Sequence, residues 1–69
     1  MVIKGSAYKH GVEKEDILHA LRMRFPRVSV LDEGVAMFVS PARDGRLLEI
    51  AVNRDGAVIH AMAARQKFL

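Results

Sequence analysis

The chain has 69 residues, of which 51% are hydrophobic and 28% are charged. This composition excludes an intrinsically disordered chain, whose apolar content is too low to offset chain entropy. Eleven Lys and Arg against eight Asp and Glu give a net charge of +3, which is compatible with an anionic partner such as nucleic acid without requiring one. We expect a single domain over residues 1–69. A chain this short buries only about 60% of its unfolded surface, so a bound partner or self-association would add stability.

The absence of cysteine limits the cellular compartments and the metal cofactors that can be expected. The sequence offers no disulfide and no thiolate ligand, which favours the cytoplasm over an oxidising compartment. The start of the chain is too short and too polar for a signal peptide, and no apolar run approaches the roughly 20 residues that cross a bilayer. The three histidines lack a metal-ligand spacing. We therefore expect a cytoplasmic protein with no membrane contact, no metal and no other cofactor.

The first third of the chain predicts one helix. Residues 2–4 are a short apolar start that suits an edge strand, and a short helical turn is expected near residues 7–10. Residues 12–25 then carry apolar side chains at the spacing of one helical face. That stripe consists of Ile17, Leu18, Leu21 and Phe25. Acidic residues begin this segment and basic residues end it, in keeping with the helix dipole, and Pro26 marks its end.

From Val28 onward the pattern changes to runs rich in β-branched residues, which are typical of strands. The four runs are Val28–Leu31, Val35–Ser40, Arg46–Asn53 and Ala57–Met62. Each turn between them ends in glycine, which supplies the positive φ that tight hairpins need. The expected fold is α+β, with one main helix packed through Leu18 and Leu21 on a four- to five-stranded, mainly antiparallel meander. Residues 63–69 are expected to form a short tail or helical turn.

The last two predicted strands carry the best candidates for chemistry. Glu49 lies in an apolar strand, and alternation places it on the face opposite its two neighbours. A hairpin loop of two or four residues would put His60 on the same face as Glu49. A three-residue loop with a glycine bulge, which Asn53 and Gly56 favour, would put it on the other face. In the first case the carboxylate supports a protonated imidazole, and in the second His60 is a core residue facing the helix.

Basic residues near these strands suit an anionic ligand. Arg65 follows the last strand, and its planar guanidinium matches the oxygens of a phosphate. Arg46 and Lys67 would add further contacts to the same anion, although a solvated tail is the alternative for Lys67. Together these residues favour proton transfer beside a phosphate.

Three segments of the chain resemble the BrnT-type toxins, which are small proteins of the RelE-like superfamily. They are the run Lys9-His10-Gly11-Val12 before an acidic helix, a glutamate in a mid-chain strand, and the terminal run Ile59-His60-Ala61-Met62-Ala63-Ala64-Arg65. The resemblance implies a RelE-like fold. It also implies an RNA endonuclease that acts as the toxin of a type II toxin–antitoxin system and is neutralised by a DNA-binding antitoxin protein.

The resemblance also assigns residues by position. Lys9 and His10 match the opening Lys-His of the family and are expected to bind RNA. Glu49 matches the strand glutamate, and Arg65 matches the arginine that follows the terminal strand.

The resulting hypothesis is a metal-free endoribonuclease that cleaves mRNA. His60 would act as general acid or base, with Glu49 as its partner, while Arg65 stabilises charge on the scissile phosphate. Attack by the adjacent 2′-hydroxyl would leave a 2′,3′-cyclic phosphate. The alternative is a non-catalytic module that binds a protein partner through an exposed strand edge.

Overall fold

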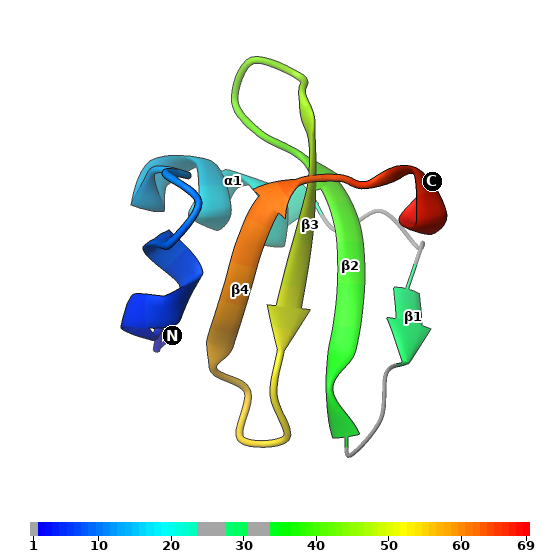
Figure 1. Ribbon diagram of the computed structural model, residues 1–69. Coiled ribbons are helices and arrows are strands. Elements are labelled where there is room, and N and C mark those ends of the chain that lie inside the picture. Colours follow the sequence, from blue (N-terminus) through cyan, green and yellow to red (C-terminus); the bar gives the residue numbers. More distant parts are fainter. Residues whose placement is uncertain (1, 24–27, 31–33) are drawn as a thin grey trace.

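The computed structural model describes residues 2–23, 28–30 and 34–69, and Figure 1 shows how their elements are arranged. In chain order the elements are η1 (Gly5–Tyr8), α1 (Lys14–Met23), β1 (Val28–Val30), β2 (Ala36–Pro41), β3 (Leu47–Val52), β4 (Val58–Ala63) and η3 (Gln66–Phe68). The α+β class is confirmed. The predicted helix over residues 12–25 is confirmed in its middle, and its predicted end at Phe25 and Pro26 lies outside the described residues.

The strands form an antiparallel meander in the order β1-β2-β3-β4. Three strands of six residues, β2 to β4, make up the body of the sheet, and the three-residue β1 pairs with β2 at one edge. The predicted four to five strands therefore reduce to three long strands and a short edge strand. The expected edge strand over residues 2–4 is wrong, because Ile3 forms only a single parallel bridge to Val58.

Both long hairpins turn on an Arg-Asp-Gly sequence. The backbone N–H of Ala42 donates to the carbonyl of Arg46 over 2.7 Å, and that of Asn53 donates to the carbonyl of Ala57 over 2.9 Å. Each pair encloses a three-residue loop that ends in a glycine with positive φ, +82° at Gly56, where a side chain would be strained. In the second loop the Asn53 side-chain oxygen also accepts two backbone hydrogen bonds. The three-residue loop that the sequence favours there is confirmed.

A bulge in β4 changes the face on which the following residues lie. Val52 pairs with Val58, in line with the three-residue loop. The next pair joins Ala51 to His60, so the register shifts by one and Ile59 is the extra residue. An extra residue reverses the alternation of side chains beyond it. The loop alone would have turned His60 towards the helix, and the bulge turns it to the opposite face.

The α1 helix packs against the other face of the sheet. It contributes Ile17 and Ala20, which are 0% and 1% exposed, to a buried cluster with strand residues such as Leu48 and Ile50. Leu21 packs against this cluster as predicted, but the cluster does not include Leu18. The helix is therefore rotated from the expected orientation. Among the described residues, no helix is long and apolar enough to span a membrane.

Polar contacts between α1 and the end of β2 account for this rotation. The Ser40 hydroxyl donates to the carbonyl of Ala20 over 2.7 Å in the buried interior. His19 Nδ1 lies 2.9 Å from the carbonyl of Pro41 and donates to it, since a carbonyl can only accept. A helix fixed by these two contacts directs Ile17 and Ala20 at the sheet.

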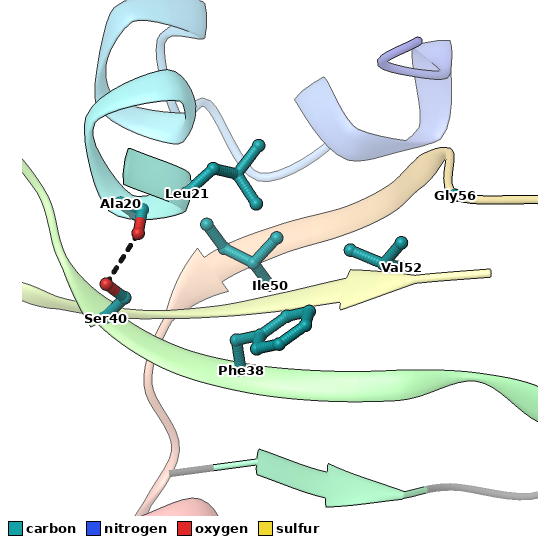
Figure 2. A pocket seen from close by; sticks show the side chains of 7 residues that line it. All are labelled: Ala20, Leu21, Phe38, Ser40, Ile50, Val52 and Gly56. Atoms are coloured by element: carbon teal, nitrogen blue, oxygen red, sulfur yellow. Dashed lines mark hydrogen bonds between the residues drawn. The ribbon is translucent and has the colours of Figure 1, made fainter. Parts of the chain in front are cut away.

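An apolar cavity of about 220 Å³ lies between α1 and the helix-facing side of the sheet (Figure 2). It is lined by Ala20, Leu21, Phe38, Ser40, Ile50, Val52 and Gly56. The atoms along its wall lack packing partners on one side, so close packing contributes less here than elsewhere in the core. The hydrogen bond between Ser40 and Ala20, drawn in Figure 2, joins helix and strand beside this space.

Candidate functional site

Glu49 and His60 lie on the sheet face opposite α1 and are hydrogen-bonded to each other. The bulge pairs His60 with Ala51, two residues from Glu49 on the same face of β3. The distance from His60 Nε2 to Glu49 Oε2 is 2.9 Å. The sequence left open whether Glu49 and His60 lie on the same face or on opposite faces, and the structure places them on the same face. The three-residue loop alone would have placed them on opposite faces, but the extra residue Ile59 returns His60 to the face of Glu49.

Arg65 joins this pair from the segment that follows β4. In Figure 1 this segment crosses β3 and β2 towards η3. The backbone N–H of Arg65 donates to Glu49 Oε1 over 2.8 Å, and Nε donates to the same oxygen over 2.9 Å. Nη2 donates to Oε2 over 2.7 Å. We call Glu49, His60 and Arg65 the carboxylate cluster, and it holds the C-terminal segment on the sheet.

The three side chains of the carboxylate cluster differ in their exposure to solvent. The Glu49 side chain is 0% exposed, that of His60 is 24% exposed and that of Arg65 is 46% exposed. Burial by itself raises the pKa of Glu49, but the hydrogen bonds from Arg65 and His60 outweigh it and lower the pKa to about 2. The hydrogen bond to Glu49 raises the pKa of Arg65. Glu49 is therefore an ionised anchor at neutral pH, while its two partners face solvent.

The ionised state of Glu49 fixes one proton on His60. A carboxylate without a proton can only accept, so His60 Nε2 carries a hydrogen and donates it to Oε2. Proton exchange with a ligand then falls to Nδ1, the second ring nitrogen. Because Glu49 is so weak a base, the groups available for chemistry in this cluster are the imidazole and the guanidinium.

A second histidine lies against this cluster. The rings of His10 and His60 are 5.4 Å apart between centroids and cross at 76°, an edge-to-face arrangement. His10 is exposed and follows η1, fifty positions before His60 in the chain. The resemblance carried by the run from Lys9 to Val12 implied an RNA contact at His10, and the sequence gave no signal that His10 meets His60, because their contact depends on the bulge.

The remaining predicted contacts fall in two places. Lys9 is exposed beside His10, and Lys67 Nζ lies 5.1 Å from the centroid of the Phe68 ring. Arg65 Cζ lies 5.4 Å from the same centroid, so Phe68 connects Lys67 to the carboxylate cluster. Sequence analysis did not single out Phe68 as a site residue.

Arg46 lies in different surroundings. Its Nε donates to Asp44 Oδ2 over 3.0 Å in the loop between β2 and β3. It lines a shallow hollow together with Glu13, Asp16, Arg43 and Asp44. The structure therefore groups Arg46 with the acidic residues near α1, whereas Lys67 lies close to the carboxylate cluster.

Within the part of the chain that the structure describes, no group of three or more His, Cys, Asp or Glu residues is arranged to hold a metal ion. Comparisons with protein families, with curated proteins and with solved structures found no match to this chain.

Proposed function

We propose that this chain is a cytoplasmic endoribonuclease that cleaves RNA without a metal, and that it is the toxin of a type II toxin–antitoxin system. The observation that supports this best is the carboxylate cluster, in which one buried carboxylate presents an imidazole and a guanidinium on the same surface. The resemblance of its motifs to the BrnT-type toxins, with their RelE-like fold, supports the same proposal.

The three residues take distinct roles in this proposal. His60 exchanges a proton with the RNA through Nδ1, as general acid or base. Glu49 fixes the orientation of His60 and of Arg65 without touching the substrate. Arg65 uses some of its N–H groups on Glu49, and those that remain bind the scissile phosphate and stabilise the charge of the transition state. The attacking group is the adjacent 2′-hydroxyl, and the product carries a 2′,3′-cyclic phosphate.

Exposed basic residues extend the proposed anion-binding surface beyond the scissile bond. The His10 ring contacts that of His60 and Lys9 precedes it in the chain, while Lys67 and Arg65 both lie against the Phe68 ring. Such contacts bind the RNA backbone without reading sequence. Arg46 would contact RNA only where a strand extends to the loop between β2 and β3.

The test uses the purified full chain with RNA in the presence of EDTA, followed by end-group analysis. We expect cleavage that leaves a 2′,3′-cyclic phosphate, and a loss of about 100-fold or more in His60→Ala. Glu49→Ala is also expected to be impaired, because it releases both active groups. Absence of cleavage by the wild type, or cleavage by both variants at the wild-type rate, would remove the proposal.

A non-catalytic interaction module is the second candidate. The observation that favours it is the outer edge of β1, which is the end of the sheet and has no neighbouring strand among the described residues. Such an edge can pair with a strand of a partner protein. In that case the carboxylate cluster only fastens the C-terminal segment.

Expression in cells separates the two candidates. The toxin proposal predicts growth arrest on induction, relieved by co-expression of a small DNA-binding protein encoded beside this gene. Tight binding of that neighbour with no growth arrest and no RNA cleavage would favour the interaction module instead.

A further inference from the structure

His10 and His60 are brought together by a set of contacts centred on the bulge in β4. The Ser6 hydroxyl of η1 donates to the carbonyl of Ile59, the extra residue of the bulge, over 2.7 Å. The same distortion that turns His60 to the outer face therefore fixes η1 beside β4. Both rings depend on one local irregularity of the sheet.

The turn after η1 then directs His10 towards His60. The backbone N–H of Lys9 donates to the carbonyl of Ser6 over 3.3 Å, and that of Gly11 donates to Tyr8 over 3.1 Å. Gly11 has a φ of +79°, which glycine adopts without strain and which redirects the chain towards α1. His10 thus sits at a fixed turn rather than on a free loop.

The two imidazoles differ in their surroundings. His60 is anchored through Nε2 to the ionised Glu49, which leaves Nδ1 as the ring nitrogen that can accept a proton from a ligand. His10 is exposed to solvent, so water can restore its proton after each turnover. Cleavage of RNA by its 2′-hydroxyl needs both a group that removes a proton and a group that supplies one.

We propose that His10 is a catalytic residue, the general acid that protonates the leaving oxygen while His60 acts as the general base. This inference rests on the proposed function and divides its acid and base roles between the two rings. It replaces the role of a simple RNA contact that the family resemblance implies for His10.

The step balances without a further reactant. His60 Nδ1 removes the proton of the 2′-hydroxyl as its oxygen bonds to phosphorus, and the bond between phosphorus and the 5′-oxygen breaks. His10 donates a proton to that departing oxygen. The products are a 2′,3′-cyclic phosphate and a free 5′-hydroxyl, and exchange with water returns each imidazole to its starting state.

The test compares two RNA oligonucleotides of one sequence that the wild type cleaves. In the second, sulfur replaces the 5′-oxygen at the cleaved bond, because a thiolate leaves without being protonated. We expect His10→Ala to cleave the oxygen-linked RNA about 100-fold or more slowly, and the sulfur-linked RNA within a few-fold of the wild-type rate. His60→Ala is expected to be slow on both substrates, and the control His19→Ala on neither.

Three outcomes of this experiment would overturn the inference. Wild-type rates in His10→Ala on both substrates would exclude a catalytic role, and equal losses on both would show that His10 only binds RNA. If the wild type cleaves neither substrate, the proposed function fails together with this inference. Thermal unfolding of His10→Ala near the wild-type temperature would show that the loss is not one of folding.

Discussion

Two ion clusters in this molecule are built in the same way and differ in what surrounds them. In one, Asp16 on α1 accepts the backbone N–H of Arg43 over 3.1 Å and its Nε over 2.8 Å. In the other, Glu49 accepts the backbone N–H of Arg65 over 2.8 Å and its Nε over 2.9 Å. The two arginines are similarly exposed, at 49% and 46%. Each cluster fastens a segment without regular structure onto the fold.

The difference lies in the carboxylate and in the third partner. The Asp16 side chain keeps 11% of its surface exposed and pairs with a loop near Glu13, 3.6 Å from Arg43. Glu49 is fully buried, and its third partner is the imidazole of His60. The hydrogen bonds from Arg43 lower the pKa of Asp16 as well. A carboxylate and an arginine are thus sufficient to anchor a segment, and the added imidazole gives the Glu49 cluster a group that can transfer protons.

The largest expected effect on stability follows from breaking the buried carboxylate. Glu49→Gln removes the charge that both Arg65 and His60 face, and we expect a loss of roughly 3 kcal/mol in the free energy of unfolding, as the lowered pKa of Glu49 implies. Asp16→Asn is expected to lose clearly less, because its site is closer to water. Urea unfolding of both variants at pH 7 makes the comparison, and equal losses would contradict it.

Acid should destabilise the protein through the same carboxylate. The pKa of Glu49 is about 2 in the folded protein, below its ordinary value of 4.5. Its contribution is therefore fully present above about pH 4.5 and is lost as the pH falls towards 2, up to roughly 3 kcal/mol. Unfolding free energies measured between pH 2 and 6 should fall more steeply in the wild type than in Glu49→Gln. Parallel curves would show that Glu49 is not held ionised.

Substitutions of Arg65 and Arg43 should distinguish a catalytic role from a purely structural one. Arg65→Ala is expected to lower RNA cleavage about tenfold or more, because it removes the guanidinium that the proposed mechanism places on the scissile phosphate. Arg43→Ala is the matched control, with the same kind of backbone and side-chain contacts to a carboxylate, and its cleavage rate should stay at the wild-type level. Initial rates at equal fractions of folded protein provide the measurement. A similar loss in both variants would indicate that only folding is affected.

The smallest effect is expected at the exposed cations. Lys67→Ala removes one charge beside Arg65, and RNA affinity should fall a few-fold, with a shallower dependence of log Kd on log salt by about 0.7. Arg54→Ala removes one charge from the turn between β3 and β4, at the opposite end of the sheet from the C-terminal segment (Figure 1). Binding isotherms at several salt concentrations should leave that control unchanged. Equal changes in the two variants would show that net charge alone governs binding.

Local sequence rules were enough to predict most of the fold. Strand periodicity and the glycine turns gave the meander, and the spacing of apolar residues gave the helix. They failed for Leu18, because the rotation of α1 is set by polar contacts such as that of Ser40 with Ala20, which lie 20 positions apart in the chain. Contacts of this kind join distant segments and leave no periodic signal.

The sequence was enough to predict which residues make up the candidate site, but not that they contact one another. Glu49, His60 and Arg65 stand out as polar residues in apolar surroundings, but their meeting depends on the extra residue Ile59. The turn residues predict the loop length correctly and would by themselves have separated Glu49 from His60. No residue type demands a bulge at Ile59, so neither the shared face nor the contact with His10 follows from the sequence.

A comparison of His60 with His19 tests the proposed catalytic role of His60. His60 is bonded to Glu49 on the outer face, and His19 is bonded to the carbonyl of Pro41 beside the Asp16 cluster. Both are partly buried, and each is replaced by glutamine in the full chain. The measurement is the RNA cleavage rate in EDTA. A loss of about 100-fold or more in His60→Gln, with His19→Gln unchanged, is the predicted result, whereas equal rates in the two variants would contradict a catalytic role for His60.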